Sequence, residues 1–188
     1  MQSLLFNNLH IENEPVNVPL PDGITLTIKR EDKNHPFVSG NKLRKLKYNI
    51  AQAQQEGKDT ILTFGGAYSN HIAATAAAGQ IVGLKTIGVI RGDELGSKID
   101  VNPTLKFAKS CGMDFYFVTR EAYRRKHTPE FLENLRKRYG QNIYIAPEGG
   151  TNELAVKGCE EILTPEDNAF DVICSAVGTG GTISGLIN

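Results

Sequence analysis

Short apolar stretches recur along the chain at a nearly constant interval from residue 60 onward. Their starting positions are 26, 29, 28 and 29 residues apart, close to the roughly 30 residues of a strand–helix–strand unit. Because these stretches are apolar throughout and do not alternate, they are typical of a parallel sheet with both faces covered. The expected strands are 60–64, 86–90, 115–118, 143–146 and 172–177. The pattern therefore predicts an α/β fold with open parallel sheets covered by helices.

Helix boundaries are predicted in the gaps between these stretches. At 102–103 and again at 128–129, an N-cap residue is followed by proline, which favours the first position of a helix. Gly112 and Gly140 fall where these two helices should end. Residues 70–82 are rich in alanine and fill the first gap. The gaps thus contain the helices that parallel crossovers need.

The first forty residues follow a different pattern. Residues 24–29 alternate apolar and polar side chains, as in a half-exposed strand, and prolines break much of the rest into loops. A helix is expected to begin at Asn41, with an apolar stripe along one face. The stripe consists of Leu43, Leu46, Ile50 and Ala53. Toward the other end of the chain, Asn152 is expected to cap a last helix.

Composition and charge argue against two broad classes of function. The 188 residues include 21 basic and 21 acidic side chains, so a net charge of zero gives no electrostatic case for nucleic acid or an anionic membrane surface. No segment approaches the ~20 apolar residues that cross a membrane. A local basic run is interpreted as a solvated helix face. It consists of Arg120, Arg124, Arg125 and Lys126.

The cysteines indicate a reducing compartment. Cys111, Cys159 and Cys174 form no CxxC pair, and an odd number of cysteines cannot all be paired within one chain. Cys159 lies on a helical stripe and Cys174 in an apolar run, so both are expected to be buried thiols. The first residues lack the basic start and long apolar stretch of a signal peptide. We therefore expect a cytoplasmic protein.

The first candidate for chemistry is a lysine at the start of a predicted helix. With Asn41 as the N-cap, Lys42 falls in the first turn, where the helix dipole disfavours a cation. This placement makes more sense if the nitrogen forms an imine or lies beside an anion. Lys45 shares the same helix face at i, i+3. The alternative interpretation is a pair of ordinary surface lysines.

A second candidate follows the first buried strand. The turn at 65–71 opens a helix at the end of a parallel sheet, where ligands usually bind. First-turn N–H groups, the Ser69 hydroxyl and the Asn70 amide could bind a carboxylate or phosphate there. The alternative is plain N-capping by Ser69 or Asn70, which is compatible with ligand binding. This argument gives His71 no role, and no spaced set of ligand residues predicts a metal site.

The third candidate is a glycine-rich turn after the last apolar stretch. Its N–H groups can form a nest for one phosphate. A dinucleotide fingerprint needs glycine where Ile183 stands. A Walker A motif needs a lysine next to the loop in sequence, and none is there. A phosphate held without such a lysine suits a cofactor better than a nucleotide undergoing hydrolysis. The loop consists of Gly178, Thr179, Gly180, Gly181 and Thr182.

Together these motifs resemble a known enzyme family. Residues 40–46 read Gly-Asn-Lys-Leu-Arg-Lys-Leu, with Gly-Gly at 65–66 and Ser-Asn-His at 69–71. Their order and spacing are similar to those of the 1-aminocyclopropane-1-carboxylate (ACC) deaminase/D-cysteine desulfhydrase family, and the resemblance spans nearly the whole chain. It implies a pyridoxal phosphate (PLP) enzyme with the tryptophan synthase beta-like fold, also called PLP fold type II.

The resemblance also implies roles for individual residues. Lys42 would bind PLP covalently, and Asn70 would hydrogen-bond the hydroxyl of the cofactor ring. Ser69 would contact the substrate carboxylate and act as a nucleophile or base, with Asn70 and His71 completing the substrate-binding group. The loop at 178–182 would hold the cofactor phosphate. The implied reaction is that of a lyase, deaminase or hydrolase, in which ACC or D-cysteine gives a 2-oxo acid and ammonia.

The sequence departs from the family in three respects. Tyr68 stands where glutamine is usual, which changes the expected carboxylate pocket. The loop sequence Gly-Thr-Gly-Gly-Thr is closer to that of cysteine synthases and threonine dehydratases, an alternative enzyme class. The chain also ends six residues after the loop, so we expect a truncated product or a partner chain. The expected domains are a partial larger PLP-binding domain at 1–44 and 152–188 and a smaller α/β domain at 45–151.

The remaining alternatives are a non-catalytic α/β domain that binds a phosphate ligand and an inactive fragment of a PLP enzyme. The expected partners are a small amino-acid substrate and, if the fold is completed, a second copy of the chain in a homodimer. The expected cofactor is pyridoxal 5'-phosphate.

Overall fold

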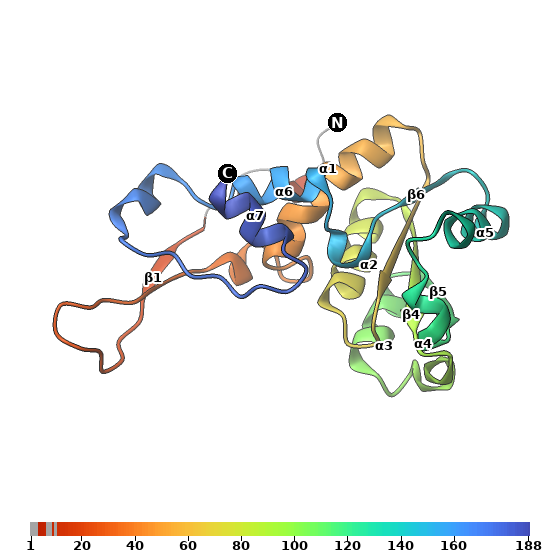
Figure 1. The fold of residues 1–188 in the computed structure, drawn as a ribbon, viewed down its shortest axis with the longest axis horizontal. Helices are drawn as coiled ribbons and strands as arrows, with labels where there is room; N and C mark the ends of the chain where they lie inside the picture. Colours follow the sequence, from red (N-terminus) through yellow and green to blue (C-terminus); the bar gives the residue numbers. More distant parts are fainter. Residues whose placement is uncertain (1–3, 7–8, 10) are drawn as a thin grey trace.

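A four-stranded parallel sheet forms the centre of the computed structural model, which describes residues 4–6, 9 and 11–188. The strand order is β5-β4-β3-β6, and β3 is buried along its whole length. Figure 1 shows this sheet with helices on both sides. The strands are β3 (Thr60–Gly65), β4 (Lys85–Arg91), β5 (Met113–Val118) and β6 (Ile143–Ile145). Four of the five predicted strands and the parallel arrangement are therefore confirmed.

The helices follow the chain order that the sequence predicts. The α-helices are α1 (Asn41–Gln55), α2 (Asn70–Val82), α3 (Pro103–Ser110), α4 (Arg120–Arg124), α5 (Pro129–Tyr139), α6 (Glu153–Glu160) and α7 (Gly181–Ile187). The short 3-10 helices are η1 (Leu4–Phe6), η2 (Glu31–Lys33), η3 (Asp93–Lys98), η4 (Glu148–Gly150) and η5 (Pro165–Ala169). Asn102, Thr128 and Asn152 each accept a backbone N–H three residues later, so these predicted caps are confirmed. Among the described residues, no helix is long and apolar enough to cross a membrane.

Alternate side chains of the strands pack against opposite helical layers. Ile61 of β3 belongs to a core shared with α1 and α2, whereas Leu62 and Phe64 face the layer built by α4 and α5. A third cluster, which includes Ile90 and Leu105, joins α2 and α3 to β4. Because both faces are covered in this way, the strands can be apolar at every position.

Helices α1, α6 and α7 pack together beside the sheet (Figure 1). Two glycines allow this close approach. An ideal Cβ at Gly158 would lie 2.0 Å from the carbonyl oxygen of Arg44, and one at Gly185 would lie 2.5 Å from Cβ of Cys159. Cys159 is fully buried in this contact, as predicted. The packing fixes the start of α1 next to the start of α7.

The prediction of a fifth buried strand at 172–177 is wrong. This segment forms no strand, and the side chains of Val172 and Val177 are 76% and 64% exposed. Cys174, predicted to be buried, is exposed as well. The physical reason is that a strand needs a neighbour for its ladder hydrogen bonds, and none of the described strands forms such a ladder with this segment.

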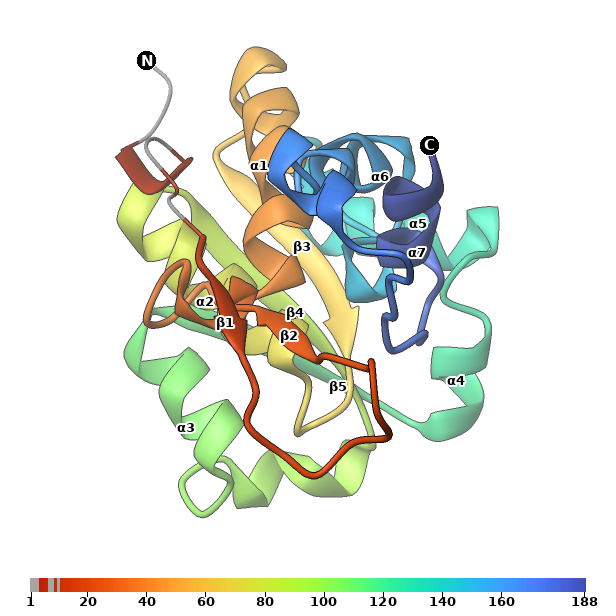
Figure 2. The same cartoon turned by 90° about the vertical axis from the view of Figure 1, so that its left-hand side faces the viewer.

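The N-terminal region forms a separate two-stranded antiparallel sheet (Figure 2). Its strands are β1 (Asn13–Pro15) and β2 (Thr27–Lys29), so the predicted strand at 24–29 is shorter than expected. Its apolar Ile28 is among the exposed side chains. Lys29 is anchored to η5 by an ion pair of 2.8 Å with Asp167, which ties this sheet to the C-terminal half of the chain.

Candidate functional site

A cavity of about 350 Å³ lies at the carboxyl end of β3. Three of its walls come from distant parts of the chain: the start of α1, the turn between β3 and α2, and the glycine-rich loop before α7. Glu148 and Gly149 of η4 add a fourth. The structure therefore brings together the three sequence candidates. The residues used below that line it are Asn41, Lys42, Gly66, Ser69, Asn70, His71, Glu148, Gly178, Thr179, Gly180 and Thr182.

The start of α1 is fixed to the glycine-rich loop by Asn41. The N-cap of the helix is Gly40, with φ of 65°, and not Asn41 as predicted. Glycine takes this left-handed backbone conformation without steric cost, and the helix consequently begins one residue earlier. The Asn41 side chain is then free to donate to Thr182 Oγ1 at 2.7 Å and to accept from Lys42 Nζ at 2.9 Å. It orients the lysine amine at the cavity.

The environment of Lys42 favours its neutral form. Burial lowers the pKa of the Lys42 amine, and the positive charge of Lys45 lowers it further. A neutral amine is the form that attacks a carbonyl carbon or accepts a proton. Lys42 is half-buried and lines the cavity, which does not fit the interpretation as an ordinary surface lysine.

Lys45 is a candidate site residue that the sequence analysis passed over. Its side chain is only 2% exposed, and Nζ donates to Thr151 Oγ1 at 3.2 Å and Thr179 Oγ1 at 3.4 Å. An ideal Cβ at Gly181 would lie 3.1 Å from this nitrogen. A lysine therefore does lie beside the loop in space, although none lies near it in sequence. The i, i+3 spacing from Lys42 was the available signal.

The ammonium group of Lys45 is buried without a carboxylate beside it in the described part of the chain. Within the part of the chain that the structure describes, no ion pair of Lys45 is recorded. Burial lowers its pKa, which reports the cost of keeping a charge there without a counterion. An anionic ligand at the loop would offset that cost.

The turn before α2 combines capping with access to the cavity. Ser69 is the N-cap of α2, and its Oγ accepts the backbone N–H of Ile72 at 3.3 Å. Gly65 has no space for a side chain, because an ideal Cβ would lie 2.5 Å from Cγ1 of Ile72. The capping interpretation is therefore confirmed for Ser69. Both Ser69 and Asn70 nevertheless line the cavity.

His71 is buried, and only one of its two ring nitrogens has a hydrogen-bond partner among the described residues. Its Nε2 lies 2.9 Å from Thr63 Oγ1, and the Thr63 hydroxyl proton is directed to the carbonyl oxygen of Ala146 at 3.1 Å. We therefore assign the ring proton to Nε2, which leaves Nδ1 as an acceptor. Among the described residues, Nδ1 has no hydrogen-bond partner. Burial, and then the charges of Lys42 and Lys45, lower the pKa of His71 to about 3, so the ring is neutral.

The glycine-rich loop leaves open space where side chains would otherwise stand. At Gly178 and Gly180 an ideal Cβ would meet no atom within 4 Å, and Gly180 has a φ of 84°. Thr179 Oγ1 lies 2.5 Å from Thr151 Oγ1, which fixes the loop against η4 and the start of α6. The loop thus presents backbone and hydroxyl groups to the cavity, next to the buried ammonium of Lys45.

These groups fit a cofactor that carries both a phosphate and an aldehyde. The ammonium of Lys45 and the open glycine loop suit the phosphate, and the amine of Lys42 suits the aldehyde. The unpartnered Nδ1 of His71 is the kind of buried polar atom that a ligand satisfies. No group of three His, Cys, Asp or Glu side chains able to hold a metal ion occurs among the residues that the structure describes.

Comparisons with known proteins point to the same cofactor. A sequence model of the family described as "Pyridoxal-phosphate dependent enzyme" matches residues 9–188. A putative ACC deaminase of Thermotoga maritima is 36% identical over 170 residues, covering 87% of this chain and 53% of that protein. A bifunctional D-cysteine desulfhydrase/ACC deaminase of Arabidopsis thaliana is 34% identical over 185 residues, covering 90% and 46% respectively.

Solved structures agree with the sequence comparisons. The crystal structure of an ACC deaminase homologue superposes with a TM-score of 0.76 at 27% identity, covering 98% of this chain and 57% of that one. The chain spans about half the length of the curated relatives it matches. These matches confirm the predicted resemblance, the PLP fold type II architecture and the cofactor. The chain belongs to the family of pyridoxal-phosphate dependent enzymes.

Proposed function

We propose that this chain is the part of a PLP-dependent lyase or deaminase that anchors the cofactor and binds the substrate carboxylate. The expected reaction converts a small amino acid, ACC or D-cysteine, to a 2-oxo acid and ammonia. The observation that carries the proposal is the meeting of Lys42, the 65–70 turn and the glycine-rich loop in one cavity. Lys45 lies behind this loop and donates to Thr179, which lines the cavity. The names of the similar proteins support deaminase and desulfhydrase chemistry, and we retain no separate hydrolase assignment.

The two lysines would bind different parts of the cofactor. Lys42 would form the covalent bond, because it lines the cavity and burial lowers its pKa, which increases the share of the neutral amine. Lys45 and the loop at 178–182 would hold the phosphate through the ammonium group, the hydroxyls and the backbone N–H groups. We propose Asn70 for the ring hydroxyl on the strength of the family resemblance alone.

The substrate would bind on the other side of the same cavity. Ser69 and the first N–H groups of α2 would receive its carboxylate, since the helix N-terminus favours an anion. His71 lines the same cavity, and its free Nδ1, an acceptor, would receive a hydrogen bond from an N–H group of the substrate. When bound, PLP supplies an electron sink for the carbon next to the amino group. Lys42 is the nearest candidate base, because its amine reaches the cavity with a lowered pKa.

The organisation of the whole protein belongs to the same proposal. We assign residues 1–44 and 152–188 to a partial larger PLP-binding domain and residues 45–151 to the smaller α/β domain. The four-stranded parallel sheet lies wholly within residues 45–151. We also propose a cytoplasmic location and a homodimer of the completed fold.

Cofactor uptake by the purified chain tests the proposal. PLP is added and absorbance is recorded, and we expect a band near the visible edge that is absent in Lys42→Ala. The matched control is Lys137→Ala, which removes a lysine from the exposed face of α5, away from the cavity. A band that persists in Lys42→Ala would rule out this anchor. No uptake at all would favour a non-catalytic phosphate-binding domain or an inactive fragment.

A further inference from the structure

A second cavity, of about 540 Å³, adjoins the cofactor cavity at the carboxyl edge of the sheet. Gly66 and Glu148 line both cavities, so the two spaces meet at the turn after β3. Tyr68, which departs from the family pattern, lines the second cavity. Four basic side chains line it as well: Arg91, Arg120, Arg124 and Lys126. The basic run that the sequence analysis interpreted as a solvated face therefore borders a cavity.

Carboxylates balance only part of this charge. Lys126 pairs with Glu148 Oε2 at 3.1 Å, and Arg120 pairs with Glu94 Oε1 at 2.5 Å. Glu148 also accepts the hydroxyl of Tyr123 at 2.8 Å. In the described part of the chain, no ion pair is recorded for Arg91 or Arg124. The cavity therefore has an excess of positive charge, and two of its guanidinium groups are available to an anion.

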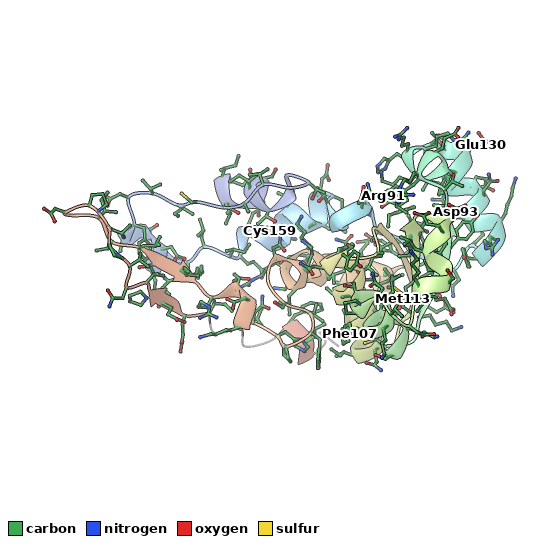
Figure 3. The ribbon with its side chains drawn as sticks, turned by 90° about the horizontal axis from the view of Figure 1, so that it is seen from below. Arg91, Asp93, Phe107, Met113, Glu130 and Cys159 are labelled. Atoms are coloured by element: carbon green, nitrogen blue, oxygen red, sulfur yellow. The ribbon has the colours of Figure 1, made fainter. Side chains whose placement is uncertain are left out.

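Arg91 is the basic residue nearest the substrate turn. It is the last residue of β4, next to the end of β3, since Gly65 pairs with Ile90. Figure 3 labels Arg91 and Asp93 in the half of the molecule that contains the parallel sheet. An ideal Cβ at Gly66 would lie 3.7 Å from Arg91 Nη2, and the guanidinium carbon lies 5.8 Å from the Tyr123 ring centre. Its charged end thus lies beside the turn proposed to bind the substrate carboxylate.

We infer that Arg91 binds an anionic group on the substrate side chain, so that the site accepts small amino acids with an acidic side chain in preference to their neutral analogues. The inference rests on the proposed function and extends its substrate class. A planar guanidinium group can donate two parallel hydrogen bonds to a carboxylate, sulfonate or phosphate. Because the two cavities share Gly66 and Glu148, an anion bound at Arg91 lies next to a substrate bound on the 65–70 turn.

Binding of an isosteric pair of amino acids tests this inference. The chain is first loaded with PLP, and loading is verified by the absorbance band that depends on Lys42. Aspartate and asparagine, each as both enantiomers, are then titrated calorimetrically. We expect the better-bound aspartate to bind about 10–100-fold more tightly than its asparagine counterpart, as charge-assisted hydrogen bonds imply. In Arg91→Gln, the affinities for aspartate and asparagine should differ by no more than about three-fold.

Arg125→Gln is the matched control, because it removes the same charge from an exposed residue that does not line the cavity. This variant should keep the preference for aspartate. Equal affinities in the unaltered chain, or a preference that survives Arg91→Gln, would overturn the inference. Sulfate binding that depends on Arg91, without any preference for aspartate, would indicate a site for free anions and would also overturn it. A loaded chain that does not discriminate leaves the proposed function standing, whereas a chain that takes up no PLP removes both.

Discussion

Lys42 and Lys45 lie one helical turn apart and meet different partners. Lys42 donates to Asn41 at the open cavity, whereas Lys45 is enclosed between Thr151 and the glycine-rich loop. The burial of both amines is unfavourable in the absence of an anion. A phosphate beside Lys45 would make this arrangement favourable, so the two lysines are best understood as parts of one cofactor site.

Replacing Lys45 tests its assignment to the phosphate. Lys45→Met keeps an unbranched side chain but removes the charge-assisted hydrogen bonds, so PLP should bind about 10–100-fold more weakly. Equilibrium titration followed by absorbance measures this loss. Pyridoxal, which lacks the phosphate, is the control ligand and should bind both forms equally. An equal loss for PLP and pyridoxal would contradict the phosphate role.

The buried neutral ring of His71 predicts acid sensitivity. Its pKa is lowered to about 3 in the folded chain, whereas an unfolded histidine titrates near pH 6.5. Below pH 6.5 the unfolded state therefore binds the proton and the folded state does not, so stability falls until about pH 3. From pH 7 to pH 4.5 this loss amounts to roughly 2–3 kcal/mol.

Urea unfolding at the two pH values measures this contribution. His71→Gln removes the titrating ring, so its unfolding free energy should fall by about 2–3 kcal/mol less than that of the unaltered chain over the same interval. Identical losses in the two proteins would show that His71 is not the group responsible.

At the residue scale, the sequence predicted positions whose signal is local. Lys42 and Ser69 follow from helix starts and glycine turns. Lys45 was passed over because its partners Thr151 and Thr179 are 106 and 134 residues away. The residue pattern alone gave His71 no role, because its burial depends on contacts with Thr63 and Gly150 that no spacing rule reports. Only the family resemblance placed His71 in the substrate-binding group.

At the element scale, helix starts were predictable because an N-cap acts within one turn. Asn152 illustrates a cap that also has a tertiary role. It accepts the N–H of Ala155 at 2.9 Å and donates to Asn49 Oδ1 at 2.8 Å. Tyr144 donates to the same oxygen at 2.8 Å, which links α6 to α1 and β6.

The exposed cap Thr128 and the more buried cap Asn152 give a matched pair of variants. Thr128→Ala removes an exposed cap of α5 and an exposed hydrogen bond to the carbonyl oxygen of Arg125, and should cost about 1 kcal/mol. Asn152→Ala should cost about 2–4 kcal/mol, because it also removes two hydrogen bonds to the buried amide of Asn49. Denaturant unfolding of both variants checks the difference. Equal costs would mean that the network adds no stability beyond the cap.

Residues 172–177 have the apolar pattern of a buried strand but form no strand. They are apolar, as a buried parallel strand requires, yet Val172 and Val177 face solvent. Strand formation depends on a neighbouring ladder, and that condition lies outside the segment itself. A capping side chain finds its partner within the first turn of its own helix, which is why the caps of α3, α5 and α6 were predicted correctly.

At the scale of the whole molecule, the cofactor cavity connects three parts of the chain. Residues near 42, 70 and 180 come from α1, the turn before α2 and the loop before α7. The α/β class and the order of the elements followed from the sequence, whereas the packing of α1, α6 and α7 beside the sheet did not. That packing depends on Gly158 and Gly185, whose close contacts have no local signature.

A ligand that bridges these parts should stabilise the folded chain as a unit. At a PLP concentration about 100-fold above its Kd, the unfolding free energy should rise by about 2.7 kcal/mol. Thermal or urea unfolding with and without PLP measures the gain, and Lys42→Ala should lose most of it. A gain of equal size in that variant would mean that PLP stabilises the chain from another site.

The covalent anchor is the central claim, and borohydride reduction of the PLP-loaded chain tests it most directly. Reduction makes the bond between PLP and an amine permanent, and peptide mapping by mass spectrometry then locates the added mass. We predict a single stoichiometric label on Lys42, within the peptide that begins α1. A label on Lys45 or another lysine, or no label after verified exposure to PLP, would contradict the account.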